Sequence, residues 1–369
     1  MAKLYKYKIN KNILITLLCF IVISIVSIYS AGNIIGINNL FVKQIIWFIS
    51  GFLTIYLIAK TYNDDIYSSY KILYVFGNII LVLLLLFAPP INNSKCWFNI
   101  FGIGTVQPSE FMKIILIITN AVIIDKHNKK KDKKDITLIL KIFIVTLIPS
   151  ILTFLEPDTG MVIIYFVISI SMLFISGINI KWFISLIIII STFLSIFLLI
   201  YFYKEDLFIK VFGSSFFYRI DRLLDWKDGV GMQLTNALNG IGSAFIFGHG
   251  FNNTPIYFPE PQTDFIFSVF ATNFGLIGSI ILISIIIYFD FSIINIGIKC
   301  KNKIDKYVIS GIVGMLLYQQ IQNIGMNIGL LPITGITLPF ISYGGSSLLS
   351  YMIIVGLILN ISNDKRKKH

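Results

Sequence analysis

Apolar runs of about 20 residues recur along the whole chain, with short polar breaks between them. A run of this length crosses roughly 30 Å of hydrocarbon as a helix, which satisfies its own backbone polar groups. With 56% hydrophobic residues, 13% charged residues and a mean hydropathy of +0.84, the chain is too apolar to fold as a soluble globule. The sequence therefore predicts an all-α polytopic membrane protein that forms one domain over residues 1–369.

The chain is predicted to cross the membrane about ten times. The fourth span is short, and it reaches a full length only if Ser109 and Glu110 already lie in the membrane or in a protein-lined cavity. A large loop, residues 204–263, separates the seventh and eighth spans and is rich in Phe, Leu and Ile. The expected spans are Ile13–Ser30, Gln44–Lys60, Ile72–Phe87, Phe111–Ile124, Ile136–Leu155, Gly160–Ile178, Trp182–Tyr203, Phe265–Tyr288, Tyr307–Gly325 and Leu348–Ile361.

Lysine clusters indicate the orientation, because short cytoplasmic loops retain Lys and Arg. The clusters lie within residues 3–11, 126–134, 299–306 and 365–368, which share one side of a ten-span arrangement. Both termini are then cytoplasmic, and loop 204–263 is extracytoplasmic. These lysines flank apolar spans and carry no interleaved aromatic platform for bases, which favours contact with anionic membrane lipids and argues against nucleic-acid binding.

Other site classes have no support in the sequence. The three histidines and three cysteines are far apart and have no metal-ligand spacing, so no protein-held metal site is predicted. A glycine-rich loop followed by Lys-Ser or Lys-Thr is also absent, which argues against an ATPase.

Unusual polar residues gather in the segments that face outward. Asp264 opens the eighth span, where a carboxylate is costly unless it is solvated, paired or catalytic. Glu110 and Lys113 lie one helical turn apart, a spacing that allows an ion pair. Asp158 precedes Thr159 and fits either a helix cap or a substrate contact.

These segments, in this order and spacing, resemble the SEDS family of bacterial cell-wall proteins, which includes RodA, FtsW and SpoVE. Any one of the motifs would be weak evidence, but four in register along a ten-span chain are specific. The motifs are Gln107-Pro108-Ser109-Glu110 with Lys113, Pro157-Asp158-Thr159-Gly160, Pro259-Glu260 with Thr263-Asp264-Phe265-Ile266-Phe267, and Leu331-Pro332-Ile333-Thr334-Gly335 running on to Ser347. Gln262, Thr272, Asn273 and Cys96 depart from the residues usual in the family.

The resemblance implies an inverting peptidoglycan glycosyltransferase of the bacterial plasma membrane. Such an enzyme polymerises lipid II during elongation, division or sporulation and works with a class B penicillin-binding protein. Asp264 matches the family's essential acidic residue, which implies a general base for the acceptor hydroxyl. The departing polyprenyl pyrophosphate is anionic, so cationic side chains or a divalent cation such as Mg²⁺ or Mn²⁺ are expected to stabilise it.

The candidate substrate-binding residues follow from the same resemblance. Lys113 and Lys95 are expected to contact the pyrophosphate, with Arg219 and Arg222 as weaker candidates. Glu110 is expected to position Lys113, and Ser346 to line the sugar cavity.

Simpler interpretations stay open at this stage. Glu110 and Lys113 also fit a structural salt bridge, Asp264 a helix cap, and Ser346 close packing after two glycines. Two other functions compete with the polymerase. A lipid II flippase would work independently of Asp264, and a non-catalytic scaffold that activates a class B penicillin-binding protein would tolerate its loss.

Overall fold

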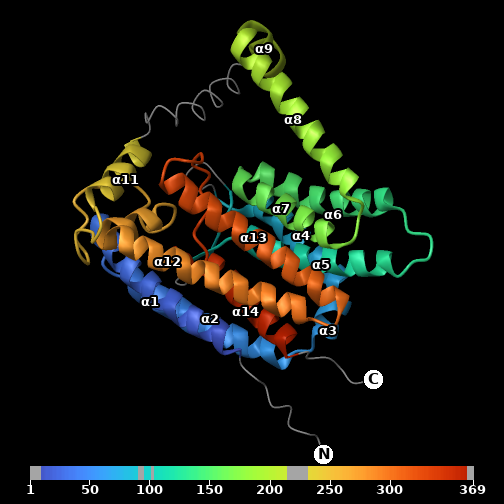
Figure 1. Cartoon of the computed structure of the whole chain (residues 1–369), viewed down its shortest axis with the longest axis horizontal. Helices are drawn as coiled ribbons and strands as arrows, with labels where there is room; N and C mark the ends of the chain where they lie inside the picture. The colour runs from blue at the N-terminus through green and yellow to red at the C-terminus, as the bar shows by residue number, and fades with distance from the viewer. Residues whose placement is uncertain (1–9, 90–94, 101–103, 214–231, 364–369) are drawn as a thin grey trace, which may run out of the picture.

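The computed structural model describes residues 10–89, 95–100, 104–213 and 232–363, which form a bundle of helices with one short β-hairpin (Figure 1). The helices are α1 (Lys11–Ile34), α2 (Leu40–Lys60), α3 (Asn63–Ser68), α4 (Tyr70–Phe87), α5 (Pro108–Asn128), α6 (Asp135–Leu155), α7 (Thr159–Ile175), α8 (Ile180–Tyr203), α9 (Glu205–Phe212), α11 (Met232–Ser243), α12 (Ile266–Lys299), α13 (Lys303–Asn327) and α14 (Gly345–Ser362). Strands β1 (Phe98–Ile100) and β2 (Gly104–Val106) pair antiparallel.

Each of the ten predicted spans falls on a helix, namely α1, α2, α4, α5, α6, α7, α8, α12, α13 and α14. In the described part of the chain, seven helices are long and apolar enough to cross a membrane, and α7 is a shorter apolar helix. The other two, α5 and α13, carry more polar side chains in their interiors. The predicted fold class is confirmed, and the number of spans stays a prediction.

Helix α5 occupies the middle of the bundle and packs against α4, α6, α7, α13 and α14. Its first turn begins with Pro108, which supplies no backbone N–H at a position where none is needed. Glu110 and Lys113 are buried inside the protein, so the polar start of this helix does not face lipid. This burial meets the condition that the short fourth span requires.

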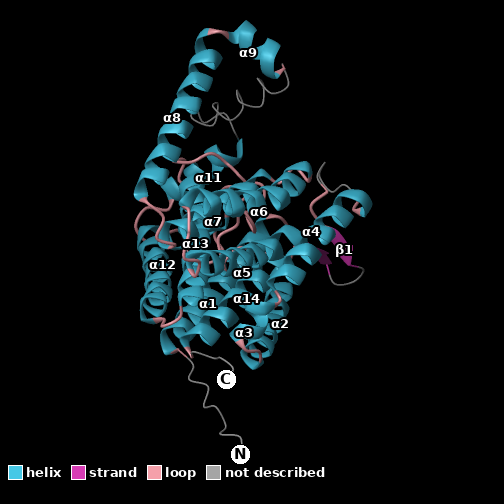
Figure 2. Cartoon of the chain, turned by 90° about the vertical axis from the view of Figure 1, so that its right-hand side faces the viewer, coloured by secondary structure: helices cyan, strands magenta, loops and turns pink. Residues whose placement is uncertain are grey.

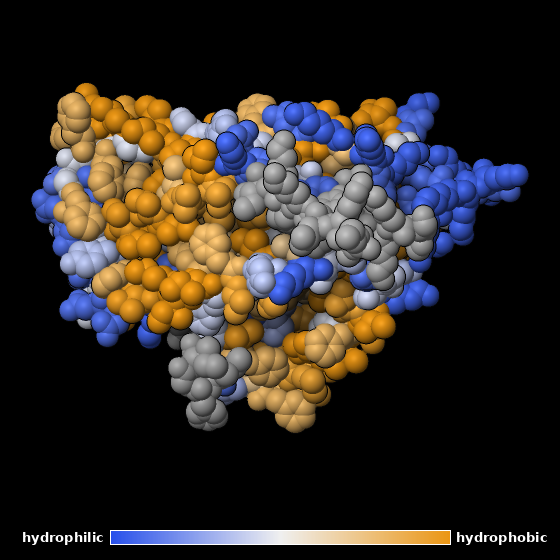
Figure 3. All heavy atoms as spheres, turned by 90° about the horizontal axis from the view of Figure 1, so that it is seen from below, coloured by the Kyte–Doolittle hydropathy of each residue, from blue (hydrophilic) through white to orange (hydrophobic). Residues whose placement is uncertain are grey.

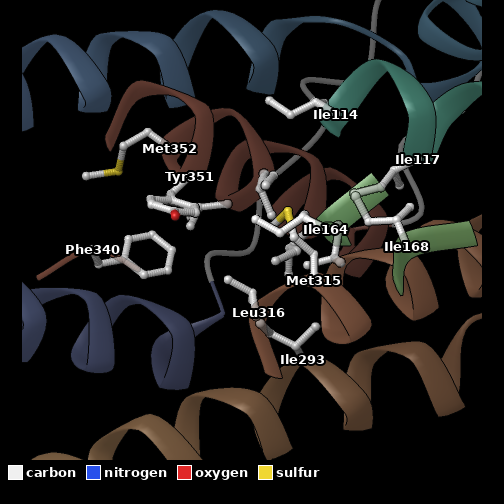
Figure 4. Close-up of a cluster of buried hydrophobic side chains, with 14 of the residues drawn as sticks. Ile114, Ile117, Ile164, Ile168, Ile293, Met315, Leu316, Phe340, Tyr351 and Met352 are labelled. Atoms are coloured by element: carbon white, nitrogen blue, oxygen red, sulfur yellow. The ribbon is translucent and has the colours of Figure 1, made fainter. Parts of the chain in front are cut away.

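An aromatic cluster anchors the loop that precedes α14, and Figure 4 shows two of its members, Phe340 and Tyr351, beside buried aliphatic side chains. Phe340 stacks on Phe20 with ring centroids 5.5 Å apart and contacts Tyr351 at 5.2 Å. Phe289 of α12 packs edge-on to Phe340 at 5.3 Å. Because α1, α12 and α14 all contribute rings, this loop is fixed to three helices.

Helix α12 is kinked at Gly275, where φ is +63°. The backbone of residues 245–250 closes against the kink, and Phe245 O and Ile246 O accept the N–H groups of Leu276 and Ile277. A Cβ on Gly275 would lie 2.4 Å from the backbone nitrogen of Gly248, so a glycine is required there. The kink thereby holds the loop that leads toward Asp264.

Helix α8 projects away from the bundle and carries α9 at its far end (Figures 1 and 2). In the most apolar stretch of α8, 18 residues long, no residue is buried inside the protein. Figure 3 shows broad hydrophobic areas on one face of the molecule, as expected of a surface that faces lipid. Helices α9 and α11 lie within the predicted loop 204–263.

Candidate active site

A cavity of about 570 Å³ lies where the four motif segments meet. The sequence separates these segments by up to 240 residues, and the bundle brings them together at one end of α5, α7, α12 and α14. The wall includes Lys43 and Trp47 of α2, Cys96, Trp97, Thr105 and Gln107 around the hairpin, Glu110, Pro157 to Met161, Glu260, Thr263, Asp264, Gln319, Thr334 to Thr337, and Tyr343 to Ser347.

Asp264 lines this cavity from the loop just before α12 and is partly buried. Its carboxylate faces Gly335, because a Cβ on that glycine would lie 3.8 Å from Asp264 Oδ2. Burial raises the pKa of Asp264 to about 6, and the negative charge of Glu260 adds to the shift. Such a carboxylate is ionised at neutral pH and binds a proton more strongly than an ordinary aspartate, as a general base requires.

Hydrogen bonds from α13 fix the backbone at Asp264. Asn323 Nδ2 and Asn327 Nδ2 both donate to Asp264 O, at 3.0 and 2.9 Å. Asn327 Oδ1 accepts from Ser268 N and Oγ in the first turn of α12. The Asp264 side chain accepts no capping bond from α12, so the capping interpretation is wrong for this residue.

The loop before α14 holds the same segment from its other side. Tyr343 N donates to Gln262 O at 2.8 Å, and Ser342 Oγ donates to Thr263 O at 2.6 Å. The Glu260 carboxylate accepts from the Gln262 amide at 2.9 Å and from the Thr263 hydroxyl at 3.1 Å. Asp264 is therefore positioned by two elements that follow it in sequence by about 60 to 80 residues.

Glu110 and Lys113 form the predicted ion pair, with Lys113 Nζ 2.6 Å from Glu110 Oε2. Lys113 is completely buried and lies over the Tyr351 ring at 5.0 Å from the centroid. Glu110 lines the cavity and also accepts from Ser350 Oγ at 3.2 Å. Lys113 thus lies behind Glu110, outside the residues that line the cavity, and does not reach the position expected of a pyrophosphate contact.

Asp158 caps α7, as one of its two interpretations predicts, by accepting from Met161 N at 3.1 Å. It also lines the cavity and accepts from Gln107 Nε2 at 2.7 Å. Burial raises the pKa of Asp158 to about 6. Asp158 therefore both caps α7 and lines the cavity.

Ser346 connects the start of α14 to the hairpin. Its hydroxyl accepts from Gln107 N at 3.0 Å and lies 3.2 Å from Thr105 O. The residue lines the cavity, as expected, and at the same time connects the start of α14 to the segment around the hairpin.

Lys43 was not predicted, and it is the basic residue that lines the cavity in the described part of the chain. It is exposed and lies in the first turn of α2, at the end of that helix opposite Lys60. A signal was available in the sequence. Positive residues are expected on the cytoplasmic side, so a lysine at the outward end of a span is unusual.

The other predicted cations are placed differently. Lys95 Nζ donates to Leu85 O at 3.3 Å, near the end of α4, and Lys95 is not part of the cavity wall. Arg219 and Arg222 lie outside the described residues.

Among the described residues, no group of three or more His, Cys, Asp or Glu side chains could hold a metal ion. The divalent cation expected at the departing pyrophosphate stays a prediction.

The residues that depart from the family pattern lie in three places. Gln262 lies in the loop before α12, where it donates to the Glu260 carboxylate and does not line the cavity. Cys96 lines the cavity and donates its thiol to Glu156 O at 2.8 Å. Thr272 and Asn273 are buried in α12 away from the cavity, where Asn273 Oδ1 accepts from Thr254 Oγ1 at 2.9 Å. The two α12 departures therefore affect packing of the adjacent loop, since neither residue lines the cavity.

Comparison with known proteins identifies the family. A family model described as a cell cycle protein, FtsW/RodA/SpoVE, matches residues 7–367. The chain is 33% identical over 379 residues to the "Probable peptidoglycan glycosyltransferase FtsW" of Wigglesworthia glossinidia brevipalpis, covering 97% of this chain and 94% of that protein. It is 32% identical over 305 residues to the protein of the same name from Thiomicrospira cyclica, covering 79% and 74%.

Solved structures share the fold. A chain in a structure of a peptidoglycan synthase complex has a TM-score of 0.81 at 22% identity, with 98% of this chain and 99% of that chain covered. The rod shape determining protein RodA of Thermus thermophilus has a TM-score of 0.71 at 22% identity, with the same coverage. The chain therefore belongs to the FtsW/RodA/SpoVE family, the SEDS family of bacterial membrane proteins.

Proposed function

We propose that this protein is a peptidoglycan glycosyltransferase of the bacterial membrane that polymerises lipid II into glycan strands. The observation that carries the proposal is the Asp264 carboxylate, with its pKa raised to about 6, on the wall of a cavity built from the family's four motifs. The relatives' names support the activity, and the synthase-complex neighbour supports a cell-wall role.

In the proposed reaction, the acceptor's sugar 4-hydroxyl attacks the anomeric carbon of the donor. Asp264 takes the hydroxyl proton as the new C–O bond forms, and the bond from the anomeric carbon to the polyprenyl pyrophosphate breaks with its electrons on the leaving oxygen. Attack opposite the leaving group inverts the configuration at that carbon. Hydrogen bonds from Asn323, Asn327 and Ser342 fix the backbone at Asp264 and Thr263, which helps to keep the base aligned with the acceptor hydroxyl.

Lys43 is the residue we assign to the departing pyrophosphate. It is exposed to the cavity, and no acidic side chain of the described residues forms an ion pair with it. A cation at that position stabilises charge as it develops on the leaving group. Lys113 is already neutralised by Glu110, so its role is to set the position and charge of that carboxylate.

The proposal extends to orientation and partner. Both termini and the lysine-rich segment 129–134 lie on the cytoplasmic side, and Asp264 faces outward where cell-wall precursors are polymerised. A class B penicillin-binding protein is the proposed partner, in line with the synthase complex that shares this fold.

The test is glycan-strand formation from labelled lipid II by the purified full chain, alone and with its cognate class B penicillin-binding protein. Asp264→Asn keeps the shape of the side chain and removes the base, while Asp132→Asn changes an exposed carboxylate in the α5–α6 loop. We expect polymer from the native chain and the control variant, and none from Asp264→Asn. Equal polymer from Asp264→Asn would overturn the general-base assignment, and lipid II translocation in vesicles without polymer would favour a flippase.

A further inference from the structure

A second cavity, of about 650 Å³, lies at the opposite end of the bundle from Asp264. It forms where α1 and α13 begin and where α12 and α14 end. Helix α12 connects the two ends of the molecule and spans about 50 Å if its 34 residues are counted at the helical rise. The second cavity is therefore a separate site, on the predicted cytoplasmic side.

Three lysines, from α1, α12 and the turn between α12 and α13, line this cavity. Lys11 begins α1, Lys299 ends α12, and Lys301 lies in the turn to α13. One carboxylate, Asp305, also lines it, but that side chain is buried and accepts from Tyr67 Oη at 2.7 Å. The charge that faces the cavity is therefore positive.

These lysines form no ion pair with an acidic side chain of the described residues, since the pairs found there are Glu110–Lys113 and Asp125–Lys129. Three ammonium groups around one cavity repel one another, and an anion between them would lower the electrostatic energy. The N-terminus of α1, capped by Asn10, points into the same region and adds its partial positive charge.

The position of the cavity favours a lipid phosphate over a freely soluble one. Most of its wall is polar, and its two isoleucines, Ile296 and Ile361, are buried. The cavity lies at the ends of α1, α12 and α14, three helices apolar enough to cross a membrane, and the exposed Ile15 and Ile298 lie close in sequence to Lys11 and Lys299. The phosphate of an anionic phospholipid would lie among the lysines while its acyl chains contact these exposed isoleucines, which free phosphate does not do.

We propose that this cytoplasmic cavity binds the phosphate headgroup of an anionic membrane phospholipid. The lipid would link the start of α1 to the junction of α12 and α13. The site is independent of the polymerase reaction, because none of its residues lines the Asp264 cavity.

The experiment uses the full chain purified in detergent and exchanged into phosphatidylglycerol, phosphatidylcholine with the same acyl chains, or inorganic phosphate. Native mass spectrometry counts bound lipid, and thermal unfolding reports stabilisation by ligand that binds the folded state. The test variant replaces Lys11, Lys299 and Lys301 with Gln. The matched control replaces Lys130, Lys131 and Lys133, three exposed lysines on the same side that do not line the cavity.

We expect phosphatidylglycerol, and neither of the other two additions, to be retained and to raise the unfolding temperature. The test variant should bind it about tenfold or more weakly, while the control variant binds as the native chain does. A third variant with Arg at the three positions keeps the charge and should bind, which separates loss of the site from loss of the fold. Equal binding by the test and native chains would overturn the proposal, and equal stabilisation by inorganic phosphate would overturn the lipid assignment.

Discussion

At the residue scale, the protonation state of Asp264 should control the reaction. Its pKa is raised to about 6, so the carboxylate is ionised above that pH and protonated below it. A general base acts only when ionised, and the polymerisation rate should therefore be flat near pH 7.5 and fall about tenfold per unit below pH 6. Initial rates between pH 5 and pH 8 with a saturating partner protein measure this. A rate that stays constant down to pH 5 would contradict the assignment.

Lys43 provides a second test at this scale. Lys43→Gln should lower the turnover number about tenfold, because one cation that faces the leaving group is lost. Lys43→Arg keeps the charge and should retain most of the activity. Lys60→Gln, at the other end of α2, is the matched control and should polymerise normally. An equal loss in Lys43→Gln and Lys60→Gln would show that the effect comes from the helix and not from the cavity.

The Glu110–Lys113 pair separates structure from chemistry. Lys113→Met leaves the Glu110 carboxylate buried without its partner and should destabilise the fold by about 3–5 kcal/mol, measured by thermal unfolding in detergent. The double variant Glu110→Gln/Lys113→Met removes both charges and should recover most of that stability. If the recovered protein is active, the pair is a structural salt bridge; if it is stable and inactive, the pair takes part in catalysis.

The carboxylates of the site were easier to predict from the sequence than its cation. Asp264 and the Glu110–Lys113 pair are charges at or inside apolar spans, which makes them conspicuous in the sequence. Lys43 is one lysine among many, and only its position at the outward end of α2 distinguishes it. Lys95 illustrates the opposite error, because closeness to a motif in sequence does not determine where a long side chain points.

At the element scale, the kink in α12 should be intolerant of any side chain. Gly275→Ala would place a Cβ within 2.6 Å of the Gly248 and Ile246 backbones and would force a positive φ on alanine. We expect a loss of about 2–4 kcal/mol in unfolding free energy, from strain and overpacking together.

Gly242→Ala is the control for this change. Gly242 lies in α11 with open space around its added Cβ, so the substitution should be neutral or slightly stabilising. Thermal unfolding of both variants in the same detergent measures the difference. Equal unfolding temperatures would show that the contact between the kink and loop 245–250 is unimportant for stability.

The existence of the helices was predictable because each apolar run is long enough to span a bilayer. The residues at which the helices end were harder to predict. The eighth span was expected to end at Tyr288, but α12 continues to Lys299. Asp290 does not stop the helix, because it is buried and accepts from Gln320 Nε2 at 3.2 Å on α13. The hairpin of β1 and β2 was not predicted, since two strands of three residues give too little alternation to detect.

At the scale of the whole molecule, the orientation can be tested directly. The native Cys19, Cys96 and Cys300 are first replaced with Ser, and one new cysteine is then introduced. A membrane-impermeant maleimide applied to intact cells should label Pro255→Cys, in the outward loop, and should leave Asp132→Cys unlabelled until the cells are opened. The reverse pattern would invert the predicted topology.

The arrangement of the helices could not be derived from composition. Isoleucine occurs on every side of α8 and α12, so no helix face is marked as the one that packs inward. What the sequence did predict is that the segments that carry the four motifs all face outward. The bundle brings all four to one cavity, but the hydrogen bonds between them depend on geometry that the sequence does not contain.

Those bonds have a consequence for chimeric proteins. Gln107 forms hydrogen bonds with both Asp158 and Ser346, and Ser342 donates to the backbone at Thr263. Each of the four segments that form the cavity wall is therefore complementary in shape to a neighbouring one. Transplanting a single segment from a relative would leave its neighbours facing a side chain of the wrong shape. All four wall segments must therefore be exchanged together between members of the family, although they are far apart in the sequence.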